Sequence, residues 1–144
     1  MRGYFGVALW HPKESKNVGG LWRSAHVFGA AFLATIGKRY HREPPDTSDA
    51  ASHVPLLAFE DYPSFEKIMM FDVPLVVVER TPSARHLSQF THPESAVYLF
   101  GPESGSVPDE IQAKADYCIT IPYGEWSLNL ASAGSIIMYD RVSR

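Results

Sequence analysis

The first group of residues that could do chemistry follows an apolar run near the N-terminus. Asn17, Gly19 and Gly20 precede Arg23 within one short segment. Backbone N–H groups at a helix start favour anions, and the two glycines allow a ligand to approach closely. Arg23 follows Asn17 by about one and two-thirds helical turns. These residues alone leave two interpretations open, an anion-binding helix start or a capped helix with one surface arginine.

A second group comes directly after the apolar run that ends at Phe100. Gly101, Pro102 and Glu103 follow that run. In open α/β sheets, ligands bind at the carboxyl ends of the strands. Glu103 would therefore contact a substrate or order a loop. The simpler alternative is a tight turn with a solvated carboxylate.

A third group lies between the apolar run that ends at Ile121 and the last helix. Ser127 is a ready N-cap for that helix, and capping would be a sufficient role for it. Asn129 is harder to explain, because asparagine is a poor helix former. Its place in the first turn of an apolar helix predicts a specific hydrogen bond.

Short apolar runs, rich in β-branched and aromatic residues, would form the strands that position these groups. They span residues 4–10, 31–36, 55–59, 74–78, 96–100 and 117–121. Continuous apolar runs favour strands that are buried on both faces, as in a parallel sheet. Helix signals lie between them, and the expected helices start at Asn17 (ending at Gly29), near Pro63 (running to about Met70), at Pro108 and at Ser127. This alternation predicts an α/β fold, a mainly parallel sheet flanked by helices.

The composition indicates one globular domain over residues 1–144. The net charge is −3 and Cys118 is the single cysteine, which excludes an intramolecular disulfide and a multi-cysteine zinc site. No apolar run approaches the roughly 20 residues that a membrane span needs. The N-terminus lacks the pattern of a signal peptide, so we expect a cytoplasmic protein. Because the net charge is small, a role with nucleic acid would need a local basic patch.

Taken in order, the three groups resemble the motifs of a known family. The patterns N-x-G-x-x-x-R, then G-x-E, then I-P followed by S-L-N are similar to the three motifs of the SpoU family of RNA ribose methyltransferases, within the SPOUT superfamily. The resemblance covers essentially the whole chain, and the ordered set is specific where any one motif would not be. It implies a SPOUT-type fold with a C-terminal trefoil knot, in which the last helix threads through a loop.

The resemblance also implies an activity and its residues. The reaction is methyl transfer from S-adenosylmethionine to a ribose 2′-hydroxyl of RNA, with S-adenosylhomocysteine as product and no metal. Arg23 would be the catalytic residue, supported by Asn17, Ser127 and Asn129. The backbone around Leu99, Gly101, Ile121 and Leu130 would hold the cofactor, together with Glu103, which would order the loop of the second motif. The sequence leaves open whether Arg23 accepts the hydroxyl proton or binds the adjacent phosphate and orients the hydroxyl.

Family members are homodimers whose active site forms across the interface, which the resemblance places at the last helix. Small residues there would allow close packing against another helix or subunit, and they are Ala131, Ala133, Gly134 and Ser135.

The sequence departs from the family pattern at two places near the expected cofactor site. Ser106 replaces a glycine that usually follows the motif-two glutamate, with Gly105 one position earlier. The connection at residues 123–126 is shorter than is common in the family. It would border the cofactor, so the family's cofactor contacts are least transferable to these residues.

Candidate RNA contacts follow from charge. Lys38, Arg39 and Arg42 lie close together with Tyr40 among them. Basic side chains bind phosphates, and an aromatic ring can stack on a base. A solvated basic turn at the start of a long polar loop is the alternative. Weaker candidates are Arg80, Arg85 and His86, and the histidines show no metal-ligand spacing.

Transfer RNA is the expected substrate, because short members without an appended RNA-binding domain often act on it, and ribosomal RNA is second. The expected partners are RNA and a second copy of the chain, not DNA or a membrane. A non-catalytic RNA-binding protein of the same fold is the competing class, which the altered spacings favour. The joint presence of Arg23, Ser127 and Asn129 favours the enzyme. A nucleotide-binding protein without methyl transfer is disfavoured, since no phosphate-loop motif is present.

Overall fold

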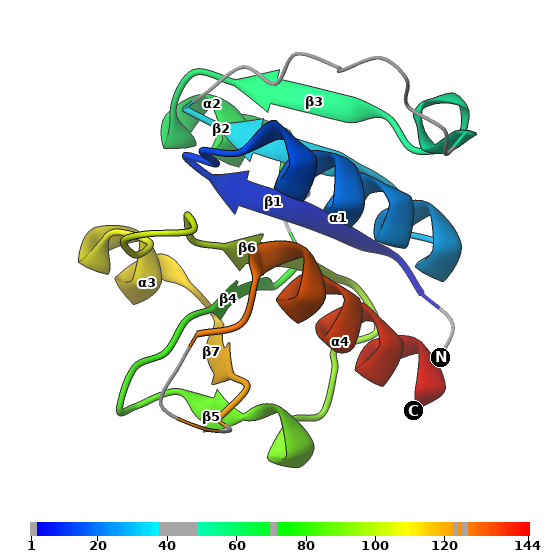
Figure 1. The fold of residues 1–144 in the computed structure, drawn as a ribbon. Helices are drawn as coiled ribbons and strands as arrows, with labels where there is room; N and C mark the ends of the chain where they lie inside the picture. Colours follow the sequence, from blue (N-terminus) through cyan, green and yellow to red (C-terminus); the bar gives the residue numbers. More distant parts are fainter. Residues whose placement is uncertain (1–2, 38–48, 70–71, 123, 125–126) are drawn as a thin grey trace.

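A parallel β-sheet with helices on both faces makes up the structure, a computed structural model that describes residues 3–37, 49–69, 72–122, 124 and 127–144 (Figure 1). Within these residues the strand order is β3-β2-β1-β6-β4-β7-β5, and the paired strands are parallel. The strands are β1 Phe5–Trp10, β2 Leu33–Ile36, β3 Leu56–Phe59, β4 Leu75–Val78, β5 Arg85–His86, β6 Ala96–Phe100 and β7 Tyr117–Thr120. The helices are α1 Ser15–Phe28, α2 Tyr62–Ile68, α3 Asp109–Lys114 and α4 Leu130–Ser143, with 3₁₀ turns η1 Asp49–Ser52 and η2 Leu87–Gln89. No helix within the described ranges combines the length and apolar character needed to cross a bilayer.

The predicted fold class is confirmed, because each of the six apolar runs forms a strand of this sheet. Strand β5 is the exception that the apolar pattern missed. It consists of Arg85 and His86, both exposed, and its register on Ile119 and Thr120 of β7 defines it. A two-residue polar edge strand carries no hydrophobic signal, so only its pairing reveals it.

The core has two layers, one on each face of the sheet. In β1, Val7 and Leu9 pack in the layer with α1 and α4, whereas Ala8 packs in the layer with α2 and α3. All three side chains are fully buried. Successive residues of a strand point to opposite faces, so burial on both faces requires an uninterrupted apolar run. This is the physical origin of the pattern that predicted the strands.

Helices α1 and α4 lie side by side on one face of the sheet (Figure 1). A Cβ atom at Gly134 would lie 2.0 Å from Cδ1 of Leu21, so glycine allows α4 to approach α1 closely. The hydroxyls of Ser24 and Ser135 are 2.7 Å apart and share a hydrogen bond. Gly134 and Ser135 of the predicted small-residue stripe therefore pack against a helix of the same chain.

Two predicted helix starts are wrong by a few residues. Helix α1 begins at Ser15 with Glu14 at the N-cap, so Asn17 lies inside the first turn and does not cap it. Helix α4 is capped by Asn129 and not by Ser127. The predicted stop at Gly29 is confirmed, since its φ of 81° is in the left-handed region that glycine adopts readily. Both errors free a side chain near the sheet edge for another role.

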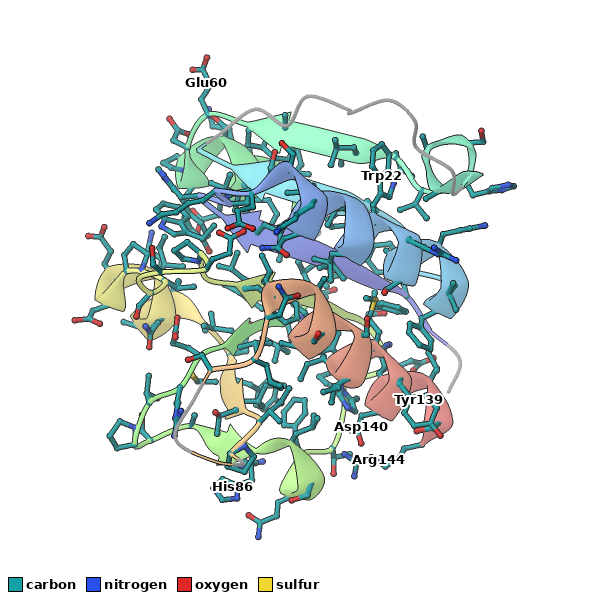
Figure 2. The ribbon with its side chains drawn as sticks, viewed as in Figure 1. Trp22, Glu60, His86, Tyr139, Asp140 and Arg144 are labelled. Carbon is teal, nitrogen blue, oxygen red and sulfur yellow. The ribbon has the colours of Figure 1, made fainter. Side chains whose placement is uncertain are left out.

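A buried arginine fastens the C-terminal end of α4 to the rest of the chain. The Arg141 side chain is 2% exposed and donates to the carbonyls of Pro93 (2.7 Å) and Glu94 (2.6 Å) and to the hydroxyl of Tyr98 (3.0 Å). His92 lies between the Tyr98 hydroxyl and Asp140, and burial lowers the pKa of His92 although Asp140 acts in the opposite direction. The last turns of α4, with Tyr139, Asp140 and Arg144, are labelled in Figure 2.

We expect Arg141→Met to lower the free energy of unfolding by about 3 kcal/mol or more, because each buried acceptor left without a partner costs about 1–3 kcal/mol. Arg144→Met is the matched control. Arg144 also donates to two carbonyls, but its side chain is 42% exposed, so water can replace it and a loss of about 1 kcal/mol is expected. Urea denaturation followed by circular dichroism measures both values. Equal small losses would show that Arg141 does not anchor α4.

Candidate active site

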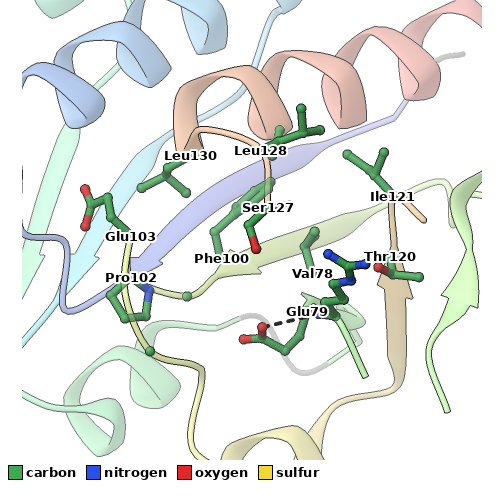
Figure 3. Close-up of a pocket in the computed structure, with 14 residues that line it drawn as sticks. Val78, Glu79, Phe100, Pro102, Glu103, Thr120, Ile121, Ser127, Leu128 and Leu130 are labelled. Carbon is green, nitrogen blue, oxygen red and sulfur yellow. Dashed lines mark hydrogen bonds between the residues drawn. The ribbon is translucent and has the colours of Figure 1, made fainter. Parts of the chain in front are cut away.

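A pocket opens at the carboxyl ends of three neighbouring strands, β6, β4 and β7, and the N-terminal turn of α4 forms its opposite wall (Figure 3). Its lining residues are Val78, Glu79, Arg80, Phe100, Gly101, Pro102, Glu103, Gly105, Thr120, Ile121, Ser127, Leu128, Leu130 and Ala133. The parallel arrangement brings these strand ends to one edge of the sheet, which is where open α/β folds bind ligands.

The pocket combines apolar and polar groups that a small ligand can contact. The empty space between its walls is about 760 Å³, including the part that is open to solvent. Phe100, Ile121 and Leu130 supply apolar surface for a base, and Glu79 and Ser127 supply hydrogen-bonding groups. A nucleoside joined to an amino acid needs this combination. The described residues gather no group of three or more metal-ligating side chains.

Glu103 joins the loop after β6 to the start of α1. Its Oε2 accepts the backbone N–H of Lys13 at 2.9 Å, and its Oε1 accepts the backbone N–H of Glu14 at 3.3 Å and the side-chain amide of Asn17 at 3.0 Å. The Lys13 side chain also reaches Ser104. One carboxylate therefore gathers three donors from residues 13–17.

Asn129 extends this link to α4. Its Oδ1 accepts the backbone N–H groups of Ala131 (3.0 Å) and Ser132 (3.3 Å), and its Nδ2 donates to Oδ1 of Asn17 at 2.9 Å. Asn17 is 5% exposed, so it donates to Glu103 and accepts from Asn129 almost out of contact with water. The specific hydrogen bond predicted for Asn129 is confirmed.

The hydrogen bonds to Glu103 outweigh its burial. Burial acts to raise the pKa of Glu103, but the hydrogen bonds from Asn17 and from the backbone of Lys13 and Glu14 hold that pKa below its ordinary value of 4.5. Hydrogen bonds to the ionised form favour that form. Glu103 is therefore a charged acceptor that orders two loops.

Comparison with known proteins agrees with this geometry. The SpoU rRNA Methylase family model matches residues 4–139. The chain belongs to this family. A tRNA (cytidine(34)-2'-O)-methyltransferase of Ancylobacter novellus is 30% identical to the chain, over 92% of this chain and 87% of that protein. A tRNA (guanosine(18)-2'-O)-methyltransferase of Mus musculus is 27% identical over 86% of this chain, which spans 8% of that protein.

Solved structures show the same fold. An AdoMet-bound rRNA methyltransferase from Sinorhizobium meliloti superimposes with a TM-score of 0.84 at 22% identity, and this chain covers 57% of it. A second solved structure, from work on the 2-OH methylation of C/U34 on tRNA, superimposes with a TM-score of 0.83 at 24% identity, and this chain covers 95% of it. The predicted membership of the SpoU family of RNA methylases is confirmed.

The structure brings most of the predicted SpoU-type residues together. Four of the predicted cofactor residues line the pocket, namely Gly101, Glu103, Ile121 and Leu130, and so does Ser127. Asn17 and Asn129 meet at its edge. The Leu99 side chain is fully buried in the core, on the face with α2 and α3. Lys38, Arg39 and Arg42 lie outside the described residues.

Arg23 is not brought to the pocket of its own chain. Its side chain is exposed on α1, and within the described ranges it has no hydrogen bond or ion pair. Asn17, six residues earlier, is buried in the hydrogen-bonded link. The two polar residues of the first motif therefore differ in their surroundings, because Asn17 is buried and Arg23 is exposed.

The sequence reasoning missed Glu79 as a pocket residue and named Arg80 only as an RNA contact. Both line the pocket directly after β4. Their position directly after the apolar run 74–78 is the signal for both residues, because ligands bind at the carboxyl ends of parallel strands.

We expect Glu103→Gln to lower the melting temperature at neutral pH, because the amide keeps one acceptor oxygen and loses the charge. A carboxyl with a lowered pKa stabilises the fold above its unfolded pKa and loses that effect as the pH falls through the folded value. The difference from wild type should therefore be full at pH 6–7 and vanish on acidification well below pH 4.5. Melting curves from pH 7 to pH 3 measure it, with exposed Glu60→Gln as the control. A difference that stays constant with pH would contradict this role.

Two substitutions at Asn129 separate its two roles. Asn129→Asp keeps the capping oxygen and loses the donor to Asn17, whereas Asn129→Ala loses both. Only Asn129→Ala should lower the free energy of unfolding by the full value of an N-cap, about 1 kcal/mol. Both should weaken S-adenosylhomocysteine binding severalfold in calorimetry. Ser127→Ala, which removes neither contact, should leave the unfolding free energy unchanged. If Asn129→Asp bound like wild type, the link to Asn17 would not shape the pocket.

Proposed function

We propose that this protein methylates the ribose 2′-hydroxyl of a transfer RNA nucleotide, using S-adenosylmethionine. The observation that carries the proposal is the pocket at the carboxyl ends of β4, β6 and β7, joined to α1 through Glu103 and Asn17. Transfer RNA is supported by the A. novellus relative, which is named for cytidine 34 of tRNA and aligns over most of both chains. Ribosomal RNA is the second candidate, because rRNA methyltransferases share the fold.

Some of the residues that line the pocket would bind the cofactor. When bound, S-adenosylmethionine supplies a methyl group on a positively charged sulfur. Gly101, Ile121 and Leu130 would hold it. A Cβ atom at Gly101 would lie 3.0 Å from Oε2 of Glu79 and 3.2 Å from the backbone nitrogen of Val107, so a larger residue would fill this space.

Arg23 would bind the phosphate next to the target ribose and orient the 2′-hydroxyl. Arginine stays protonated in proteins, which suits a phosphate clamp better than proton abstraction. Ser127 at the pocket, with Asn17 and Asn129 at its edge, would support the reacting groups. The weakly acidic hydroxyl must be positioned well, since the attack on the methyl group depends on its alignment.

A homodimer would bring Arg23 to the pocket of the second copy. Helices α1 and α4 expose apolar side chains beside each other, with Val27 68% exposed, Ile136 39% and Tyr139 62%. The Phe28 and Tyr139 rings are in edge contact across the two helices. Covering such a patch in a two-fold interface buries it and gives each site residues from both chains. We further propose the family's C-terminal trefoil knot and a cytoplasmic location.

Lys38, Arg39 and Arg42 remain the proposed RNA phosphate contacts. They follow Gly37, which comes directly after β2. Because β2 is parallel to β1 and β1 to β6, Gly37 lies at the same sheet edge as the pocket. Charge is sufficient for such contacts, so Arg39→Lys should be nearly neutral.

Arg23→Ala should reduce methyl transfer by a factor of 100 or more, of the order seen when a transition-state donor is removed, and leave S-adenosylhomocysteine affinity unchanged. Arg23→Lys should fail similarly, because an ammonium lacks the planar fork of donors. Single-turnover transfer to tRNA and to rRNA fragments, with the modified ribose located by mass spectrometry, measures the rate and identifies the substrate. Arg39→Lys is the control. Near-normal rates for Arg23→Ala would remove its catalytic assignment.

Mixed dimers test whether Arg23 acts across the interface. An Arg23→Ala protomer is paired with a Gly101→Leu protomer, whose pocket should be filled. If Arg23 serves the second copy, the mixed dimer contains one complete site and regains about half of the wild-type activity. If Arg23 serves its own pocket, both sites are defective and the mixed dimer is inactive.

A further inference from the structure

The carboxylate of Glu79 is held in a fixed position at the pocket. Glu79 comes directly after β4, between the ends of β6 and β7 in the sheet. Its Oε1 accepts the backbone N–H of Arg80 at 3.2 Å, and its Oε2 accepts the backbone N–H of Val107 at 3.0 Å. In Figure 3 it lies on the side of the pocket opposite Ser127 and Leu130. Two backbone donors on different segments fix its orientation.

Glu79 keeps acceptor capacity after these bonds. A carboxylate has about four lone-pair sites, and the described contacts of Glu79 use two of them. Glu103, the other carboxylate that lines the pocket, is instead directed to donors of residues 13–17. Its charge is engaged in holding loops together. Glu79 is therefore the carboxylate whose charge remains available to a ligand.

The negative charge of Glu79 acts on its surroundings. The thiol of Cys118 lies on the neighbouring strand β7, and burial raises its pKa, with the Glu79 carboxylate adding to the rise. The Arg80 guanidinium, at the same strand end, donates to the carbonyl of Gly124 at 2.6 Å. The charge of Glu79 is half-buried, where electrostatic interactions are screened less than in bulk water.

We propose that Glu79 makes the pocket prefer the positively charged cofactor over its neutral product. The inference rests on the proposed function. S-adenosylmethionine and S-adenosylhomocysteine share every group except one methyl and the positive charge on sulfur. Apolar walls and backbone contacts therefore bind both ligands about equally. A fixed carboxylate adds an attraction to the sulfonium of S-adenosylmethionine, and S-adenosylhomocysteine has no charge on sulfur to be attracted. This attraction would favour binding of S-adenosylmethionine, and its loss after methyl transfer would favour release of S-adenosylhomocysteine.

The experiment compares the affinities of charged and neutral ligands. Isothermal titration calorimetry gives the Kd of S-adenosylmethionine, S-adenosylhomocysteine and sinefungin, whose amine carries a positive charge in place of the sulfonium. Glu79→Gln keeps the size and an acceptor oxygen but removes the charge. It should weaken the two cationic ligands about tenfold and the neutral product less than twofold. Glu79→Asp should keep the preference, and Glu60→Gln, the same charge change on an exposed residue at the far edge of the sheet, should leave all three affinities unchanged.

If Glu79→Gln weakens all three ligands equally, or none, Glu79 does not select by charge and the inference is overturned. A wild-type protein that binds none of the three ligands would instead overturn the proposed function, and this inference with it.

Discussion

The hydrogen bonds from Asn17 to Glu103 and from Asn129 to Asn17 are the contacts on which the site depends. They join the start of α1, the loop after β6 and the start of α4, which are separated by 86 and 112 residues in sequence. Asn17 can serve both neighbours because an amide carries a donor and an acceptor, and its burial removes water as a competitor. A carboxylate in its place would lack the donor that Asn17 provides to Glu103. The positions of the pocket walls follow from this link.

The sheet places the link where it can act. Strands β4, β6 and β7 are neighbours and parallel, so their carboxyl ends meet, and β1 brings α1 beside them on the other side of β6. Helix α4 then closes the pocket from the opposite wall, and Arg141 fixes its far end. The helix is therefore held at both ends, by Asn129 at the pocket and by a buried guanidinium about three turns away.

The strands, the fold class and the residues of the three motifs could be predicted from the sequence, because burial on both faces leaves continuous apolar runs and the motifs stand in order. The caps could not. Asn17 and Ser127 look like caps locally, but tertiary contacts decide that Asn129 caps α4 and that Asn17 bridges. The one local signal for Glu79 is its place directly after the apolar run 74–78. That it lines the pocket follows from the strand order, which places β4 between β6 and β7.

A crystal structure of the protein grown with millimolar S-adenosylhomocysteine would show directly whether this link builds a cofactor site. We predict ligand density between the ends of β4, β6 and β7, with the adenosine against Gly101, Ile121 and Leu130 and with the Asn17–Glu103–Asn129 hydrogen bonds intact. Density for the ligand at another edge of the sheet, or a site without ligand at saturating concentration, would contradict the assignment of this pocket.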